Sequence, residues 1–360
     1  MRERTALARA GSAGDGLSLG LIRVVGMTTT LELVPGLITT RDEIAAAFGC
    51  GTYQGIEPAK DAKKVFVYSD PSAGAEFGYT FDGRAEDDEY GPLYLYTGYG
   101  ANGDQELKSR NKSLRYHVED GRELHLLVAH GKVPGGGAMQ QRYIGPMVVD
   151  PINPVEVRRG LGKDNKMRNA LVFRLRPVAG SAPAWTDEDR LQPAAKTAIE
   201  EIDVQPKIPA QTGVKDKNAE EHTTAETMAN IPGGQRKVVR REGLLMEAFK
   251  KHLTAAGHTH KTFQITLAGE VGALTPDLYD ETDHVLYEAK GQTTRSNVRM
   301  AIGQLADYRR HIPKPDGLRV AVLLPSEPSP DVKDLLATQG VHLVFQTENG
   351  FAGFPLPSNA

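Results

Sequence analysis

The pattern of hydrophobic residues changes twice along the chain, and these changes constrain the fold more than any other feature. Between residues 63 and 177, segments rich in Val, Tyr and Phe alternate with Gly, Pro, Asn and Asp, which predicts mostly β structure. From residue 236 onward, strand-like and amphipathic helical segments alternate, which predicts a mixed α/β sheet with helices on its faces. Residues 179–235 are rich in Pro, Ala, Thr, Gln and charge, a composition typical of a linker. We therefore predict an α+β multidomain protein.

The domain boundaries follow from these changes. Residues 31–178 are predicted to form a β-rich domain, and residues 236–360 an α/β domain. Residues 1–30 are expected to be a disordered leader, because this Gly-, Ala- and Arg-rich segment lacks the continuous apolar stretch that a secretion signal needs. Since Met27 opens a more patterned segment, we expect translation to start there, and an intact mass that includes residue 1 would contradict this.

Composition limits the location and the partners. Forty-three Lys and Arg against 46 Asp and Glu leave a formal charge of -3, so any DNA-binding surface must be a local patch. Cys50 is the only cysteine, which excludes an intramolecular disulfide framework and a zinc cluster of several thiolates. Apolar runs such as Val320–Leu324 are far too short to cross a bilayer. We therefore expect a cytoplasmic protein without a membrane partner.

Two carboxylates and a lysine are the most informative residues of the second half. Glu288 and Lys290 alternate in a strand-like segment, so they share one face, and Asp277 can lie beside them if PDLYD and HVLYEAKG pair as a hairpin. Converging carboxylates suit Mg²⁺, with Mn²⁺ as a substitute. The metal would lower the pKa of a bound water, and Lys290 would hold the water or a phosphate oxygen. The pattern predicts phosphodiester hydrolysis.

The order of elements around these residues resembles the PD-(D/E)xK nuclease superfamily over residues 236–345. Glu242 lies on the preceding helix in phase with its apolar face, and Gln304 lies in IGQLADY of the following helix, where members often carry glutamine. The resemblance implies that Asp277 and Glu288 hold the metal and that Lys290 assists the water. It also implies that Glu242 supports the metal and that Gln304 orients water or phosphate. The alternative is an unrelated α/β fold with a solvated Glu-x-Lys strand.

Tyrosines, glycines and acids gather in residues 78–114 of the β-rich half. Tyrosines at 90, 94, 96 and 99 offer flat faces close to several carboxylates. Aromatic faces with a carboxylate suit a flipped base, which needs stacking on both sides and an acceptor for its exocyclic amine. Alternatively, tyrosines at alternate strand positions face the core or the rim of a barrel.

The motif that begins at Tyr96 resembles the SRA (YDG) domain, over residues 36–177. Tyr96-Thr97-Gly98-x-Gly100 is followed by Gly103-Asp104-Gln105-x-Leu107 and Asn111-Lys112-x-Leu114, and later by VAHGKVPGGGAMQQRYIGPMVVDP. The likeness is greatest to the divergent SRA-like domains of modification-dependent endonucleases. It implies an SRA/PUA-like β-barrel with flanking helices that flips and grips a modified cytosine.

The resemblance also implies roles for individual residues. Tyr96 would stack on the flipped base, and Thr97 would contact it through its backbone. Asp87, nine residues before Tyr96, stands where the family has the carboxylate that accepts from the cytosine amino group. The acids on either side of Asp87 are alternative choices for this carboxylate.

The second stacking aromatic departs from the family pattern. The family has it three residues before the carboxylate, where this chain has Arg84. Tyr79 or Phe81 would then supply the second wall. An altered wall leaves open which modified base fits.

Together these parts predict a modification-dependent, type IV-like restriction endonuclease. The first domain would find a modified cytosine in double-stranded DNA, and the second would cut nearby with Mg²⁺. Because cutting both strands takes two active sites, we expect a homodimer on DNA. The alternatives are a non-catalytic reader of modified DNA and a repair or recombination nuclease without modification dependence.

Overall fold

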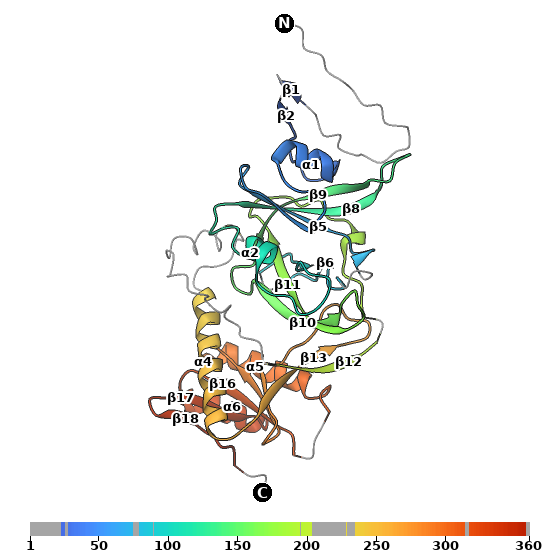
Figure 1. Cartoon of the computed structure of the whole chain (residues 1–360). Helices are drawn as coiled ribbons and strands as arrows, with labels where there is room; N and C mark the ends of the chain where they lie inside the picture. Colours follow the sequence, from blue (N-terminus) through green and yellow to red (C-terminus); the bar gives the residue numbers. More distant parts are fainter. Residues whose placement is uncertain are drawn as a thin grey trace. The chain divides into compact units, whose positions relative to one another are not determined.

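The computed structural model of the chain describes residues 23–25, 28–74, 79–88, 90–194, 196–203, 228, 235–313 and 317–357. These residues form two compact units. The first contains the described residues up to 192 together with Met228, and the second contains the other described residues from 193 onward (Figure 1). Each unit has its own mixed sheet and its own hydrophobic core. The prediction that a β-rich part is combined with an α/β part is therefore confirmed. Within these described ranges, no helix has both the length and the apolar character needed to cross a membrane.

The first unit is mostly β, as its Val-, Tyr- and Phe-rich segments predicted. Its elements in chain order are β1 (Arg23–Val25), β2 (Thr28–Thr30), β3 (Ile38–Thr40), α1 (Arg41–Phe48), β4 (Ile56–Ala59), β5 (Lys64–Ser69), β6 (Gly83–Arg84), β7 (Tyr94–Thr97), α2 (Ser109–Arg115), β8 (Glu123–Lys132), β9 (Met139–Val149), β10 (Val155–Leu161), β11 (Met167–Pro177) and a short 3-10 helix, Asp187–Asp189. The strand order of its large sheet is β4-β5-β8-β9-β11-β7-β6, with β3 paired to β9 and β10 paired to β11. Strands β5 and β8 run parallel, and the other pairs of this sheet are antiparallel.

Alternating side chains of these strands build two cores. On β5, Val65 and Val67 are buried in one cluster with residues of β8 and β11. The intervening Phe66 and Tyr68 lie in a second cluster with Ile44 of α1. Both faces of β5 are therefore covered, which explains its nearly continuous apolar sequence.

Capping residues hold both ends of helix α1. Thr40 Oγ1 accepts from the backbone N–H of Glu43 (3.2 Å), and Glu43 Oε2 accepts from the backbone N–H of Thr40 (2.9 Å). This reciprocal pair is a capping box. Gly49 ends the helix in the left-handed region, with φ of 71°.

The first unit continues beyond the predicted boundary at residue 178. Arg142 Nη2 of β9 donates to Asp189 Oδ1 (2.7 Å), and both side chains are buried. Trp185 stacks on Tyr94 of β7, with ring centroids 5.7 Å apart. These contacts hold the segment 184–189 on the sheet, although its Pro- and Ala-rich composition predicted a linker.

The second unit alternates strands and helices. Its elements in chain order are β12 (Ala198–Ile202), α4 (Gln235–Ala255), β13 (His260–Thr266), β14 (Leu278–Asp280), β15 (Val285–Ala289), α5 (Arg295–Tyr308), β16 (Arg319–Leu324), α6 (Pro330–Thr338), β17 (His342–Thr347) and β18 (Gly350–Ala352). The strands follow one another in this order across the sheet. Pairs β15-β16 and β16-β17 are parallel, and the other pairs are antiparallel.

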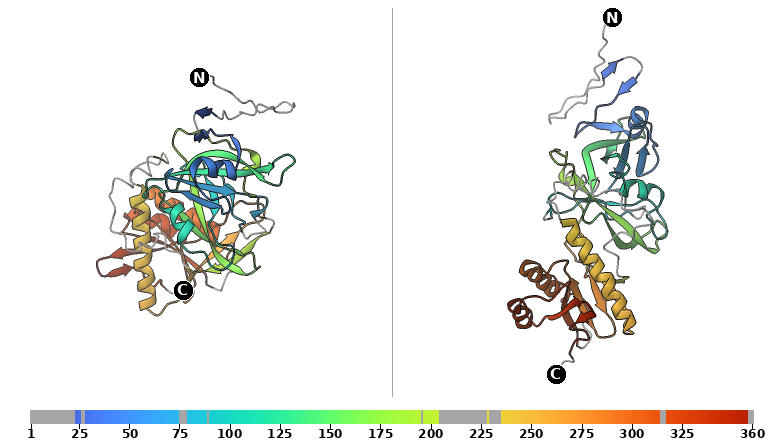
Figure 2. Two further views of the ribbon diagram at one scale, coloured as in Figure 1. Left: turned by 45° about the horizontal axis from the view of Figure 1, so that its top comes forward. Right: turned by 90° about the vertical axis from the view of Figure 1, so that its left-hand side faces the viewer.

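This sheet is the middle layer of three. The apolar face of α4, including Leu245 and Phe249, packs with Tyr287 and Ala289 of β15 on one side of the sheet. On the other side, α5 and α6 pack against Leu286 of β15 and against β16 (Figure 2). The strand β15 is therefore buried on both faces, and its end is the place where side chains from several elements can meet.

Two segments that were predicted to lack structure contain strands. Strands β1 and β2 pair with each other within the predicted leader, 1–30. Strand β12, within the predicted linker 179–235, pairs with β13, and its Ile202 is buried. The rest of the predicted leader (1–22 and 26–27, including the expected start at Met27) lies outside the described residues. So do residues 195, 204–227 and 229–234 of the predicted linker.

Candidate functional site

The motif that follows β7 is a buried, hydrogen-bonded turn. Gln105 Nε2 donates to the carbonyl oxygens of Gly98 (2.6 Å) and Gly100 (2.8 Å), and Gln105 Oε1 accepts from the backbone N–H of Leu171 (2.8 Å). A Cβ on Gly98 would lie 2.9 Å from Asn111 Oδ1, so a larger residue there would force the Asn111 side chain to shift. The motif therefore fixes the end of β7, the strand that carries the predicted stacking tyrosine.

Asp82 is a buried carboxylate beside the end of β7. Its residue is 8% exposed, its Oδ1 accepts from the backbone N–H of Thr97 (2.6 Å), and its Oδ2 accepts from Ser69 Oγ (2.9 Å). Burial raises the pKa of Asp82 to about 6, and the hydrogen bonds from Thr97 and Ser69 offset this only in part. A carboxylate has about four acceptor positions, so Asp82 keeps capacity for a further donor.

The spacing from Tyr79 indicates Asp82 as the carboxylate of the pocket, whereas the spacing from Tyr96 indicates Asp87. Tyr79 stands three residues before Asp82, the separation that the SRA family shows between its second stacking aromatic and its carboxylate. The chain between Asp82 and Tyr96 is longer than the family's nine residues. Counting back from Tyr96 therefore ends at Asp87.

Asp87, the carboxylate predicted from that spacing, lies at the surface. Its side chain is 51% exposed, and its Oδ1 lies 3.4 Å from Arg84 Nη2. The guanidinium of Arg84 lies 5.8 Å from the ring centroid of Trp185. The structure brings Asp87 and Arg84 together, and it buries Asp82 rather than Asp87 beside Thr97.

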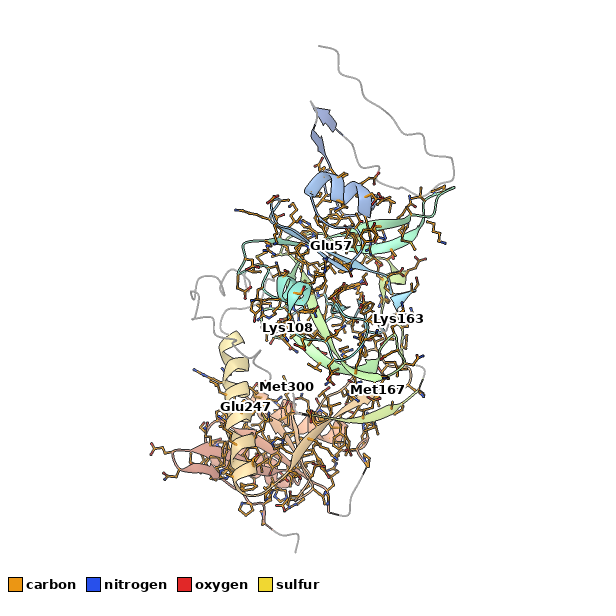
Figure 3. All side chains as sticks on the ribbon, viewed as in Figure 1. Glu57, Lys108, Lys163, Met167, Glu247 and Met300 are labelled. Carbon is orange, nitrogen blue, oxygen red and sulfur yellow. The ribbon has the colours of Figure 1, made fainter. Side chains whose placement is uncertain are left out.

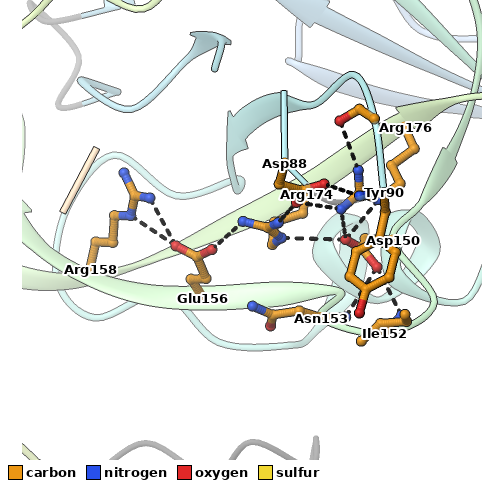
Figure 4. A network of polar contacts seen from close by, with 10 residues as sticks. Asp88, Tyr90, Asp150, Ile152, Asn153, Glu156, Arg158, Arg174 and Arg176 are labelled. Carbon is orange, nitrogen blue, oxygen red and sulfur yellow. Dashed lines mark hydrogen bonds and ion pairs between the residues drawn. The ribbon is translucent and has the colours of Figure 1, made fainter. Parts of the chain in front are cut away.

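Asp88 belongs to a network of charges that joins the segment between β6 and β7 to β10 and β11 (Figure 4). Arg174 Nη2 and Arg176 Nη2 each lie 2.7 Å from Asp88 Oδ2, and both arginines also contact Asp150. Burial alone would raise the pKa of Asp88, but hydrogen bonds from Arg176 and from the backbone N–H of Tyr90 hold it below its ordinary value. Asp88 therefore anchors the segment between β6 and β7 to β11.

The predicted aromatic walls differ in accessibility. Tyr96 is 4% exposed and belongs to the core cluster, and burial raises its pKa well above the ordinary value. Tyr79 and Phe81 are only partly buried. The guanidinium of Arg168 lies 5.9 Å from the ring of Tyr79, and that of Arg158 lies 5.5 Å from the ring of Phe81. Tyr79 and Phe81 therefore offer the more accessible aromatic surfaces.

An exposed tyrosine stands on a loop that touches Tyr96. Tyr53 is 90% exposed, and it lies in the CGTYQGI segment between α1 and β4. A Cβ on Gly55 of the same loop would lie 2.5 Å from Tyr96 Oη. Arg41 Nη1 donates to the carbonyl oxygen of Gln54 (3.1 Å), which fixes the loop. Sequence reasoning missed Tyr53, because a single exposed aromatic carries no periodic signal.

In the second unit, the predicted carboxylates and lysine meet at one end of the β14–β15 hairpin. Asp277 Oδ2 accepts from the backbone N–H of Ala289 (2.8 Å), and Lys290 Nζ donates to Glu288 Oε1 (2.7 Å). Asp277, Glu288 and Lys290 are 8%, 2% and 7% exposed. The hairpin that was predicted to bring them together is present. A buried ion pair such as Glu288–Lys290 is costly to desolvate, which is typical of a functional site rather than of a stabilising one.

Gln304 lies on α5, the helix that covers the face of β15 on which Leu286 and Glu288 lie. Its Nε2 donates to Tyr308 Oη (3.3 Å). Gln304 Oε1 is buried, and it accepts no hydrogen bond from any residue that the structure describes. Because a buried acceptor without a donor is costly, this oxygen is suited to receive a hydrogen bond from a bound water.

Glu242 links α4 to the end of β15. Its Oε2 accepts from the backbone N–H of Gly291 (3.1 Å), the residue after the lysine. A Cβ on Gly291 would lie 2.1 Å from the carbonyl oxygen of Val238, so only glycine lets α4 approach this closely. Glu247 of the same helix instead pairs with Lys250, with 3.0 Å between Glu247 Oε1 and Lys250 Nζ. Glu242 is thus the glutamate of α4 that reaches the strand end.

The donor set of this site fits a divalent cation that prefers oxygen ligands. Asp277 and Glu288 are buried carboxylates, and Asp277 accepts from the backbone N–H of Ala289, the residue after Glu288. Gln304 Oε1 is a buried acceptor on the covering helix. Carboxylate and water oxygens are the ligands that Mg²⁺ prefers. Asp277 and Glu288 are therefore the residues that would hold the metal.

A second acidic group has a structural explanation. Ligand atoms of His258, Asp280 and Asp283 lie within 4.8 Å of one another. Asp280 accepts from His258 Nδ1 (2.7 Å) and from the backbone N–H of Thr282 (3.0 Å). The bond from Thr282 closes the turn between β14 and β15, and the bond from His258 links the residues before β13 to β14. The group therefore has a structural role without a metal.

Comparison with protein families identifies the first unit. Residues 36–196 match the family described as "ScoMcrA-like, SRA domain". The resemblance to the SRA domain is confirmed by this match. Among curated proteins, no match to the chain was found.

Similar solved structures include two of ScoMcrA and one of AspBHI. "Sulfur binding domain and SRA domain of ScoMcrA complexed with phosphorothioated DNA" is 28% identical over 44% of this chain and 44% of that chain, with a TM-score of 0.32. "Structure of the Type IV phosphorothioation-dependent restriction endonuclease ScoMcrA" is 27% identical over 44% of this chain and 31% of that chain, with a TM-score of 0.31. "DNA modification-dependent restriction endonuclease AspBHI" is 8% identical over 89% of this chain and 90% of that chain, with a TM-score of 0.31. The chain spans less than half of either ScoMcrA structure.

Proposed function

We propose that this chain is a modification-dependent, type IV-like restriction endonuclease. Its first unit, an SRA/PUA-like β-barrel, reads a modified cytosine that is flipped out of double-stranded DNA. Its second unit, a PD-(D/E)xK nuclease core, hydrolyses phosphodiester bonds nearby. The match of residues 36–196 to an SRA domain supports the reader half.

The observation that carries the reader half is the buried carboxylate of Asp82 beside Thr97. A flipped cytosine presents an exocyclic amino group, which requires an acceptor in the pocket. Tyr79, three residues earlier, offers a partly accessible face for stacking, and Tyr96 lies on β7, next to Thr97. Asp87 is the alternative acceptor from the sequence, but its exposure and its pairing with Arg84 favour Asp82.

The convergence of Asp277, Glu288 and Lys290 supports the nuclease half. Mg²⁺, or Mn²⁺ in its place, supplies a water of lowered pKa and offsets negative charge when bound. The backbone N–H of Ala289 orients Asp277, and Glu288 holds Lys290 Nζ at 2.7 Å. Lys290 would hold the attacking water or a phosphate oxygen and stabilise the charge that develops there.

Two further side chains complete the proposed nuclease site. Gln304 Oε1 would accept a hydrogen bond from the attacking water and so orient it. Glu242 of α4, fixed by the backbone N–H of Gly291, would support the metal beside the end of β15. Since each chain carries one such site, cleavage of both strands requires two chains, and we propose a homodimer on DNA.

Two variants separate the two halves. Asp277→Asn keeps an oxygen that can accept from Ala289, so it is expected to fold, to bind modified duplex DNA in EDTA, and to lose Mg²⁺-dependent cleavage. Asp82→Asn is expected to lose the preference for modified over unmodified duplex. Glu247→Gln on α4 is the matched control and should change neither property.

The outcomes discriminate the alternatives. Full cleavage by Asp277→Asn would remove the assignment of the nuclease site. A wild-type chain that binds modified DNA but never cuts would be a reader only. Equal binding of modified and unmodified duplexes would indicate a repair or recombination nuclease.

A further inference from the structure

The tip of the β10–β11 hairpin presents an exposed apolar pair. Leu161 and Met167 are opposite each other across the hairpin, and they are 49% and 41% exposed. Further along the same face, Val157 is opposite Leu171 and packs against the core. By alternation, Leu161 and Met167 continue this apolar face beyond the body of the unit. Exposed apolar surface of this kind marks interaction sites.

Basic residues surround the apolar pair. Lys163 and Lys166 in the turn are exposed, and Arg159 lies at the next position of the same face. Figure 3 labels Lys163 and Met167. Asp164 is the one acid in the sequence from 159 to 168. Although the whole chain carries a formal charge of -3, this segment is locally positive. An apolar centre with ammonium groups at its edge complements a DNA duplex, whose sugars and base edges lie between two rows of phosphates.

The tip is fixed to the turn that follows β7. The backbone N–H of Lys163 donates to the carbonyl oxygen of Ala101 (2.9 Å), and the backbone N–H of Asp164 donates to Asn102 Oδ1 (3.1 Å). This turn follows directly on the strand that carries Tyr96. The tip therefore has a defined position relative to the proposed base pocket.

The opposite face of the hairpin packs against the other segment of that pocket. A Cβ on Gly160 would lie 3.1 Å from the ring of Phe81, and the guanidinium of Arg168 lies 5.9 Å from the ring of Tyr79. The hairpin is therefore in contact with both segments that supply aromatic walls. DNA that inserts a base between these segments must pass close to the tip.

We propose that the tip of the β10–β11 hairpin is a second DNA-contacting element, which grips the duplex beside the flipped nucleotide. Leu161 and Met167 pack against sugars and base edges, while Lys163 and Lys166 neutralise phosphates. This inference rests on the proposed function, because it takes modified duplex DNA as the partner.

The test measures binding of the full chain to modified and unmodified duplexes by fluorescence anisotropy, in EDTA and over a series of NaCl concentrations. For Lys163→Ala combined with Lys166→Ala, the slope of log K against log salt should become shallower by about 1.8, since each phosphate contact contributes about 0.9. For Leu161→Ser combined with Met167→Ser, affinity should fall by about tenfold at constant slope, which is the scale of burying two apolar side chains in part.

Controls come from the same unit. Val34 is 42% exposed, close to the value for Met167, and Lys60 is an exposed lysine between β4 and β5. Val34→Ser and Lys60→Ala should leave affinity and salt slope unchanged. All altered side chains are exposed, and equal melting temperatures will show that the variants are folded.

The outcomes keep this inference distinct from the proposed function. If wild type prefers modified duplex but both double variants bind with unchanged affinity and slope, the hairpin contact is wrong and the proposed function stands. An equal loss in the control variants would also overturn the hairpin contact. If wild type binds none of the duplexes, both the hairpin contact and the proposed function fail.

Discussion

Asp82→Asn is predicted to remove a pH-dependent contribution to the free energy of unfolding that arises because the carboxylate of Asp82 is buried. Burial raises the pKa of Asp82 to about 6 in the folded state, against about 3.9 in an unfolded chain. Between these values the folded state binds more protons than the unfolded state. The contribution of Asp82 to stability is therefore present at low pH and lost as the pH rises through 6. Asparagine does not titrate, so the variant lacks this dependence.

The magnitude follows from the linkage relation. A shift of this size corresponds to about 3 kcal/mol over the whole range, of which about 1.4 kcal/mol falls between pH 5 and pH 7.5. His117 and His125 act in the opposite direction, because burial lowers the pKa of each to about 4. Their stabilising effect is present above the unfolded pKa and lost as the pH falls. Both histidines are unchanged in the variant, so they cancel in the comparison with wild type.

The assay is urea unfolding of wild type and Asp82→Asn at pH 5 and pH 7.5, followed by the tryptophan signal of the first unit. The free energy of unfolding of wild type minus that of the variant should be about 1.4 kcal/mol larger at pH 5. Asp87→Asn, which alters a carboxylate that is 51% exposed, is the control and should show the same difference from wild type at both values. A pH-independent difference for Asp82→Asn would refute the burial argument.

Three further results are expected. Gly291→Ala should destabilise the second unit by about 1 to 3 kcal/mol and lower cleavage, because the new Cβ would lie 2.1 Å from the carbonyl oxygen of Val238. Urea unfolding measures the loss of stability, and a cleavage assay measures the loss of activity. Asp189→Ala should lower the free energy of unfolding of the first unit by about 3 to 5 kcal/mol, because it leaves the buried guanidinium of Arg142 without the carboxylate that pairs with it. Urea unfolding measures this, and a loss below about 1 kcal/mol would contradict the ion-pair argument. Asp82→Asn should reduce the binding preference for modified over unmodified duplex by about 1 to 3 kcal/mol, while Asp87→Asn retains it; the reverse result would restore Asp87 as the acceptor.

The arrangement of Asp277, Glu288 and Lys290, the proposed nuclease site, could be predicted from the sequence because it depends on short-range geometry. Strand periodicity puts Glu288 and Lys290 on one face, and a tight turn leaves little choice about where Asp277 lies. The structure agrees, with Asp277 bonded to the backbone of Ala289. The apolar face of α4 and the capping of α1 are local patterns of the same kind.

The proposed base pocket depends on longer segments of the chain, whose lengths a spacing rule does not predict. The chain between Asp82 and Tyr96 contains a loop anchored by Asp88 to two arginines of β11. Strand periodicity does not set the length of this loop. Counting back from Tyr96 selects Asp87, whereas the structure buries Asp82 beside Thr97; the choice between them stays a prediction. The composition of residues 179–235 predicted a linker and did not predict β12. This strand pairs with β13, and composition alone gives no information about such a pairing.

The central claim is that one chain reads a modified base and cuts beside it. It is tested most directly by Mg²⁺-dependent digestion of matched duplexes that carry cytosine, 5-methylcytosine, 5-hydroxymethylcytosine or glucosylated hydroxymethylcytosine, with EDTA and Asp277→Asn as controls. The account predicts cleavage confined to one or more modified duplexes, and none with EDTA or with the variant. Equal cleavage of all four duplexes, or cleavage that persists in EDTA, would contradict it.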